Sequence, residues 1–306
     1  MAVNWYPGHM LRARKKIKEI MPHIDIVIEV IDARIPFSSE NPIVSELRGK
    51  RPSIKILNKD DLADPEITKL WLAHLEKEQG VKAIALSMQQ KGQIRQIPSM
   101  CRKIISTKKD GIKTVRVLIM GIPNVGKSTI INILAGKNVA KVGDEPAVTK
   151  QQQRISLDNN IELYDSPGML WPRMKGEDTG YRLAVSGAIK NTALVFEDVA
   201  LYAGKYFLDR YPQALSDRYK LKEIPNTEAE LIEIIARKRG GLRAGGVIDL
   251  HKASEILLHE YRTGKLGRVS LETPEMIADE LVAIKRKEQE AKEKAAKIEA
   301  AKPHQR

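Results

Sequence analysis

The sequence contains one cysteine, Cys101, among 306 residues, so no intrachain disulfide can form and a reducing compartment is expected. Aromatic residues make up only 5% of the chain, so the core must rest on Ile, Leu, Val and Ala. No run of 18 or more uncharged apolar residues occurs, which excludes a typical membrane-spanning helix. Basic residues fill the part of residues 1–23 where a secretory signal needs an apolar segment. These absences predict a soluble, cytoplasmic protein without membrane contact.

Acidic residues are outnumbered, with 39 Asp and Glu against 52 Lys and Arg, and the net charge is +13. The excess lies in three segments: +4 over residues 1–23, +7 over 91–117 and +4 over 181–271. Such patches favour a polyanionic partner such as a nucleic acid, although lysines kept for solubility would give the same count. Charge alone leaves both interpretations open.

Hydrophobic patterns predict two kinds of architecture along the chain. Up to about residue 177, apolar strands alternate with helices, which is typical of an α/β domain with a mostly parallel sheet and helices on both faces. Beyond it, helical patterns predominate. We therefore expect an α/β domain over 1–177 with a basic N-terminal helix, a helical domain over 178–272 and a charged helical or disordered tail over 273–306. The expected strands are 24–31, 52–57, 82–86 and 114–120 with a hairpin over 152–157 and 161–165, and the main expected helices are 65–79, 92–106, 128–135, 180–190, 197–211, 228–239 and 249–262.

The most specific motif is G-x-x-x-x-G-K-S over Gly121–Ser128, placed between a strong strand and a helix. Its glycines let successive backbone N–H groups face phosphates, and the helix N-terminus adds positive partial charge. Lys127 would span the β- and γ-phosphates, and Ser128 would offer its hydroxyl to Mg²⁺. The nucleotide-contacting residues expected in this loop are Asn124, Val125, Gly126, Lys127, Ser128 and Thr129.

A second motif, D-x-x-G over Asp165–Gly168, follows an apolar strand downstream of the phosphate loop. Asp165 is placed to hold Mg²⁺ through water, and the N–H of Gly168 to sense the γ-phosphate. Thr149 lies between the two motifs in a stretch without strong structure. Its hydroxyl could join the Mg²⁺ shell only when a γ-phosphate is present.

A third motif, N-K-x-D, comprises Asn58, Lys59, Asp60 and Asp61 after the strand 52–57. The Asp61 carboxylate can accept both adjacent donors of guanine, N1–H and N2–H₂, whereas adenine would leave it unpaired. Lys59 would cover the ring face and Asn58 would brace the loop. At the end of the next strand, Ser87 could tighten this loop while the neighbouring backbone, Leu86 to Met88, meets the guanine O6.

These motifs occur in rotated order, because the guanine motif precedes the phosphate loop. Together with N-W-Y-P-G-H-M over Asn4–Met10 and Asp32-Ala33-Arg34, they resemble the ribosome biogenesis GTPase A (YlqF) family of circularly permuted GTPases, up to about residue 275. Both orders can build one site, since the motifs follow neighbouring parallel strands. The resemblance implies a GTPase that binds GTP or GDP with Mg²⁺, acts late on the maturing large ribosomal subunit, contacts rRNA through its helical domain and is released on hydrolysis.

The position after D-x-x-G is Met169, which cannot orient water as glutamine does in Ras-like enzymes, so slow intrinsic turnover is expected. The resemblance nominates His9 as the catalytic group; without it, His9 reads as a surface residue beside a helix start. Asn124 resembles an asparagine that ligates potassium in related GTPases, and a turn-stabilising role is equally compatible with the residue. Two residues depart from the family pattern: Ala147 stands where the family's loop carries glycine, and Met88 follows Ser87 in place of the usual alanine. An alanine limits positive φ at position 147.

Basic residues of the helical domain are candidates for phosphate contacts in RNA, with solvated surface as the alternative. We expect the protein to be monomeric away from the ribosome. Two other functions fit part of the sequence: a signalling GTPase with a protein partner, and an RNA-binding assembly factor whose nucleotide site is only structural. The RNA-binding candidates are Arg237, Lys238, Arg239, Arg243, Arg262, Lys265 and Arg268.

Overall fold

The computed structural model describes residues 8–106, 114–140, 153–157, 160–171, 176–189 and 195–300. Within these residues, six strands form one sheet in the order β3-β2-β1-β4-β6-β5. The pairs β1–β2, β2–β3, β1–β4 and β4–β6 are parallel, and β5 pairs antiparallel with β6. The mostly parallel α/β sheet predicted from the sequence is therefore confirmed. The strands are β1 (Ile26–Asp32), β2 (Ser53–Asn58), β3 (Val81–Leu86), β4 (Val115–Gly121), β5 (Gln153–Leu157) and β6 (Ile161–Asp165).

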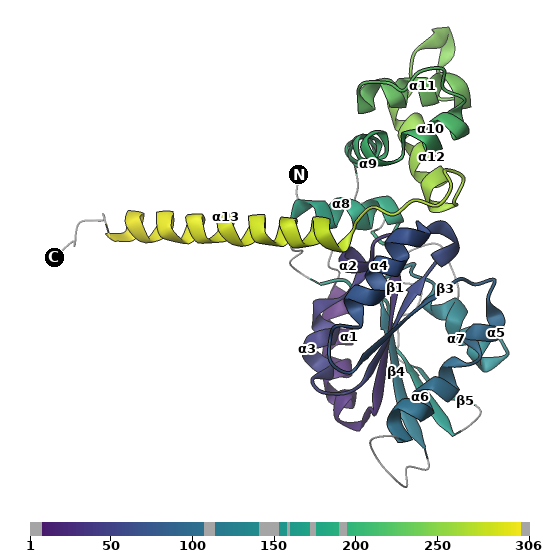
Figure 1. Cartoon of the computed structure of the whole chain (residues 1–306), viewed down its shortest axis with the longest axis vertical. Helices are drawn as coiled ribbons and strands as arrows, with labels where there is room; N and C mark the ends of the chain where they lie inside the picture. The colour runs from purple at the N-terminus through teal and green to yellow at the C-terminus, as the bar shows by residue number, and fades with distance from the viewer. Residues whose placement is uncertain are drawn as a thin grey trace.

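Helices cover both faces of this sheet (Figure 1). Successive side chains of a strand point to opposite faces, and each face carries apolar residues that helices bury. Ile26, Ile28 and Val30 of β1 belong to the buried cluster that includes α6 and α7, whereas Val27 packs with the helices of the opposite face. One face is covered by α5 (Lys91–Ile94), α6 (Ile97–Ser106) and α7 (Lys127–Ala135), and the other by α1 (Gly8–Ile20), α3 (Pro42–Arg48) and α4 (Pro65–Leu75).

The strands that follow β1 and β4 lie on opposite sides of the β1–β4 pair, with β2 and β3 on one side and β6 and the edge strand β5 on the other. Such a reversal opens a crevice at the carboxyl ends of the strands, where ligands bind in open α/β sheets. The segments after Asp32, Asn58, Leu86, Gly121 and Asp165 all leave the sheet at this edge.

A helical region follows the sheet and shares its core. The helices α9, α11 and α12 pack on one another, and α8 contacts α9, α12 and the short helix α2 (Pro36–Ser39). One buried cluster includes sheet residues and residues of α8, α9, α11 and α12, so the helical region is joined to the sheet by apolar packing. Its helices are α8 (Glu177–Ser186), α9 (Phe196–Arg210), α10 (Pro212–Tyr219), α11 (Glu228–Arg239) and α12 (Leu250–Arg262).

The last helix, α13 (Pro274–Ala300), projects from the body (Figure 1). Its first turns pack on α4 through Met276, Ile277 and Leu281, and Glu280 forms an ion pair with Arg182 of α8. None of the described helices is long and apolar enough to cross a membrane.

One predicted helix is interrupted in the structure. The continuous helix expected over 92–106 is divided into α5 and α6, which begins at Ile97. Pro98, the second residue of α6, lacks the N–H that would bond to the preceding turn, and it restricts the residue before it, so the helix restarts there.

Candidate nucleotide site

The turn between β4 and α7 has the backbone that the G-x-x-x-x-G-K-S motif requires. Asn124 and Gly126 have positive φ values of 57° and 94°, and Gly126 is the N-cap of α7. A Cβ atom added to Gly126 would lie 2.2 Å from Nδ2 of Asn58, so only glycine fits. The first N–H groups of α7 are directed toward this turn, which makes it suited to an anion.

Lys127 and Asp165 meet beneath this turn. Both side chains are buried, with exposed fractions of 5% and 0%, and Nζ of Lys127 donates to Oδ1 of Asp165. Burial raises the pKa of Asp165, and the Lys127 charge opposes that rise. Oδ2 of Asp165 has no hydrogen-bond partner among the described residues. A buried carboxylate oxygen with open coordination suits a hydrated Mg²⁺, so the residues present fit that ion.

The D-x-x-G segment lies against the phosphate loop. Ser166 N–H donates to the carbonyl of Ile119, and Met169 N–H donates to the carbonyl of Gly121 at 3.2 Å. A Cβ atom on Gly168 would approach backbone atoms of Pro123 at 3.0 Å, so glycine permits this contact. Met169 is buried and apolar, which leaves no polar side chain at the position after Gly168.

The N-K-x-D segment touches the phosphate loop directly. Asn58, the last residue of β2, donates from Nδ2 to the carbonyl of Val125 at 2.6 Å. Lys59 has a φ of 63°, and Asp60 and Asp61 form the short helix η2 (Asp60–Leu62). Two motifs that are 67 residues apart in the sequence are therefore held together by one hydrogen bond.

The neighbouring strand ends at the same edge. Leu86 of β3 pairs with Asn58 of β2, and the following Ser87 is buried. The N–H of Ser87 donates to Oε1 of Gln90 at 2.9 Å, which closes the turn after β3. The segments predicted for the guanine side are thus adjacent.

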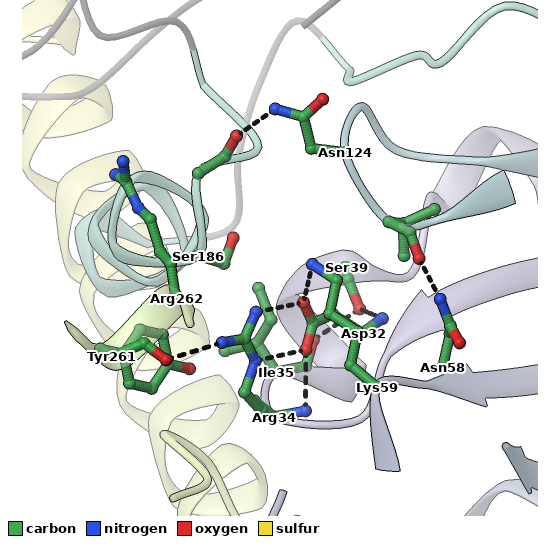
Figure 2. A network of polar contacts seen from close by, with 12 residues as sticks. Asp32, Arg34, Ile35, Ser39, Asn58, Lys59, Asn124, Ser186, Tyr261 and Arg262 are labelled. Carbon is green, nitrogen blue, oxygen red and sulfur yellow. Dashed lines mark hydrogen bonds and ion pairs between the residues drawn. The ribbon is translucent and has the colours of Figure 1, made fainter. Parts of the chain in front are cut away.

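Asp32 organises a buried charge cluster beside the N-K-x-D segment (Figure 2). Its carboxylate accepts from Nε of Arg34 at 3.0 Å, Nη2 of Arg34 at 2.9 Å and Nζ of Lys59 at 2.9 Å. Burial alone would raise the pKa of Asp32, but the charges of Arg34 and Lys59 lower it well below its usual range. The sequence Asp32-Ala33-Arg34 is part of the family resemblance but indicates no role for either charged residue. The sequence signal for this cluster was the position of Asp32, an acidic residue that ends the first strand at the same edge of the sheet as Lys59.

The helical region contacts the phosphate loop at Asn124. Nδ2 of Asn124 donates to the carbonyl of Gly187, which follows α8, at 2.8 Å (Figure 2). Arg262 of α12 donates to the carbonyls of Val185 at 2.9 Å and Ala184 at 2.7 Å. Burial, and then the charge of Arg34, lowers the pKa of Arg262 to about 10. Arg262 thus points inward and holds the last turn of α8, unlike the surface role expected for it.

Other predicted residues are placed as follows. Ser128 and Thr129 occupy the first turn of α7. His9 belongs to α1, and Thr149 lies outside the described residues. Arg237, Lys238 and Arg239 form the exposed last turn of α11, Arg243 pairs with Asp249, and Lys265 and Arg268 follow α12.

Comparisons with known proteins agree with this geometry. The family model described as "50S ribosome-binding GTPase" matches residues 116–234, from β4 into α11. Ribosome biogenesis GTPase A of Bacillus cereus is 44% identical over 296 residues, covering 94% of this chain and 100% of that protein. The chain belongs to the ribosome biogenesis GTPase A family.

More distant members and solved structures give the same result. The Thermotoga maritima member is 36% identical over 275 residues, covering 90% of this chain and 96% of that protein. The crystal structure of GNP-bound YlqF from T. maritima has a TM-score of 0.62 at 32% identity and covers 87% of this chain and 99% of that one. The GDP-bound YlqF structure has a TM-score of 0.61 at 33% identity, with coverages of 85% and 99%. This chain is therefore a GTPase of a ribosome biogenesis family, that is, a hydrolase acting on GTP.

Proposed function

We propose that this GTPase binds the precursor of the large ribosomal subunit late in assembly, that the subunit stimulates GTP hydrolysis, and that hydrolysis is linked to release. The observation that carries the proposal is the hydrogen bond between Asn58 and Val125, which places a guanine-type loop against a phosphate-type loop. The name of the matching family model, "50S ribosome-binding GTPase", supports the choice of partner. We expect the protein to act as a monomer in the cytoplasm.

In this proposal the guanine is read by the segments at the ends of β2 and β3. The Asp61 carboxylate accepts from N1–H and N2–H₂ of guanine. The aliphatic part of Lys59 covers one face of the ring, and its position is supported by the 2.9 Å contact with Asp32. The backbone between Leu86 and Ser87 lies beside O6.

The triphosphate lies on the N-terminus of α7. Lys127 exchanges its contact with Asp165 for the β- and γ-phosphates, since phosphate oxygens offer it a stronger anionic partner. Ser128, Thr149 and, through water, Asp165 would hold Mg²⁺, which would neutralise phosphate charge. The N–H of Gly168 contacts the γ-phosphate.

Hydrolysis needs a group that orients water, because Met169 and Leu170 are buried and apolar. We assign that role to His9, whose imidazole can orient or deprotonate water near neutral pH. The amide of Asn124, held beside the loop by its contact with Gly187, is assigned as a potassium ligand.

The partner surface is basic. Arg237, Lys238, Arg239, Arg243, Lys265 and Arg268 lie on the helical region, and we assign them to contacts with rRNA phosphates. Arg262 is not assigned to an RNA contact, because it donates to carbonyls of α8 and supports the position of that helix.

The test is GTP turnover with and without purified large subunits, each measured in potassium and in sodium. We expect subunits to stimulate turnover, more strongly in potassium, and association to weaken steeply with salt. Turnover that subunits leave unchanged would instead favour a GTPase with a protein partner. Assembly supported by a catalytically inactive variant would favour a structural nucleotide site.

The role of His9 has its own test. His9→Ala should bind GTP within a few-fold of the unchanged protein but lose most of the stimulated turnover, since general acid–base groups contribute about 10²–10⁴-fold. His23→Ala is a matched control, because His23 is an exposed histidine in the 3-10 turn that follows α1. Full stimulated turnover in His9→Ala would remove His9 from the mechanism.

A further inference from the structure

A basic pocket of about 880 Å³ lies where α10, the end of α11 and the segment after α12 meet. Asp217 is the one acidic residue among those that line it. The pocket is distinct from the crevice at the end of the sheet, because none of the sequence motifs for nucleotide binding lines it. Its basic residues are Arg218, Lys220, Lys238, Arg239, Lys265 and Arg268.

The positive charge of this pocket is only partly neutralised by the acidic groups around it. Arg218 donates to both carboxylate oxygens of Glu260, and Arg239 lies 3.8 Å from the same carboxylate. Asp217, Glu260 and Asp60, whose carboxylate lies 3.7 Å from Arg268, together offset three of the six positive charges. The three that remain favour an anion with more than one charge, such as a nucleic-acid backbone.

Hydrogen bonds to backbone carbonyls hold the basic side chains in place. Nζ of Lys238 donates to the carbonyl of Lys220 at 2.8 Å, and Nη2 of Arg239 donates to the carbonyl of Arg218 at 3.1 Å. The guanidinium of Arg239 also lies 5.9 Å from the centre of the Tyr219 ring. These contacts fix donor positions without removing charge, so less side-chain entropy is lost when a phosphate binds.

Arg268 belongs both to this pocket and to the guanine-type loop. Its Nε donates to the carbonyl of Ala63 at 2.7 Å, and its Nη2 donates to the carbonyl of Asp60 at 2.8 Å. The adjacent Val269 N–H donates to the carbonyl of Leu62 at 3.0 Å. A guanidinium carries five N–H donors, so Arg268 can hold these carbonyls and contact a phosphate together.

We propose that the basic pocket binds a backbone phosphate of RNA and that Arg268 links its occupancy to guanine-nucleotide affinity. The inference deepens the proposed function, on which it rests for the presence of an RNA partner. A bound phosphate restricts Arg268 to the position in which it holds η2, so the loop that carries Asp61 is ordered before nucleotide arrives. RNA and GTP must then strengthen each other's binding by the same factor.

The pocket is tested with a short RNA duplex of mixed sequence. Lys220→Gln combined with Lys265→Gln removes two pocket charges, and Lys205→Gln combined with Lys285→Gln removes two exposed charges elsewhere. We expect the pocket variant alone to lose about tenfold in RNA affinity and to show a salt dependence shallower by about two phosphate contacts. Equal RNA binding by the two variants would overturn the pocket. Thermal unfolding establishes that both variants are folded.

The link is tested by titrating a non-hydrolysable GTP analogue into the unchanged protein and into Arg268→Lys, with and without the duplex. Lysine keeps the charge but cannot reproduce the two-carbonyl contact of the guanidinium. We expect RNA to raise the affinity for the analogue about fivefold or more in the unchanged protein and to have no such effect in Arg268→Lys. Independent binding of RNA and the analogue in the unchanged protein would overturn the link.

The proposed function is separated by a parallel measurement with large subunits. Failure of the unchanged protein to bind subunits would contradict the proposed function. Subunit binding that the Lys220/Lys265 variant retains in full would contradict only the pocket.

Discussion

Gly126→Ala offers a direct test of how closely the two nucleotide loops are packed. The added Cβ would lie 2.2 Å from Nδ2 of Asn58, the atom that donates to Val125 at 2.6 Å. The substitution also places an alanine at a φ of 94°. Two separate penalties are therefore expected: backbone strain, and displacement of the side chain that joins the loops.

The magnitudes of these penalties can be separated. Strain at positive φ is about 1–2 kcal/mol for an alanine. Loss of the buried hydrogen bond to the Val125 carbonyl adds about 1–3 kcal/mol. We therefore expect Gly126→Ala to weaken GDP binding by about 3 kcal/mol, or more than about a hundredfold. Gly136→Ala is the matched control: its φ is 65°, yet nothing lies within 4 Å of the added Cβ, so only the strain applies.

The decisive measurement is a double-mutant cycle with Asn58→Ala, using GDP calorimetry and urea unfolding. Asn58→Ala removes the obstructing atom and the hydrogen bond together, so Gly126→Ala in that background should retain only its strain. The two losses should be non-additive by about 1–2 kcal/mol. Additive losses, or equal losses in Gly126→Ala and Gly136→Ala, would refute the argument that the loops are packed this tightly.

Two further predictions concern single carboxylates. Asp61→Asn should lower GDP affinity by between about tenfold and a hundredfold and favour xanthosine diphosphate, in which a carbonyl replaces the 2-amino group of guanine. Calorimetry with both nucleotides measures this change. An unchanged preference for GDP would contradict the role of Asp61. Burial, and then the charge of Glu40, raises the pKa of Glu29 from about 4.5 to about 8 against the opposing charge of Lys55. Glu29 therefore ionises at a lower pH in the unfolded chain than in the folded one, and the free energy of unfolding falls as pH rises between those values. Between about pH 5.5 and about pH 7.5, the free energy of unfolding of Glu29→Gln should rise by about 2 kcal/mol relative to that of the unchanged protein. Urea unfolding at both pH values measures this difference.

The fold and the meeting of the motifs could be predicted from the sequence because they follow from local signals. A motif placed directly after a parallel strand must emerge at the carboxyl edge of the sheet, whatever the order of the strands. Asn58, Gly121 and Asp165 are such residues, and the structure places all three at that edge.

Contacts of the helical region with these motifs could not be predicted in the same way. Arg268 and Asp60 are 208 residues apart, and their contact depends on the path of the segment between α12 and α13. Arg262 carried the same sequence signal as its exposed neighbours, since a cation after a helix is equally compatible with solvent and with buried carbonyls. Its inward position became evident only from its contacts with Ala184 and Val185.

The rotated motif order explains why the helical region can contact both sides of the nucleotide site. With the phosphate loop and D-x-x-G placed last, the chain passes from Asp165 into α8 within a short segment. The residue after α8, Gly187, accepts from Asn124 of the phosphate loop. The far end of the same region returns at Arg268 to hold the carbonyl of Asp60 in the guanine-type loop. A nucleotide that moves either loop must therefore change a contact of the helical region, and these contacts are the route by which the proposed RNA site would be linked to nucleotide affinity.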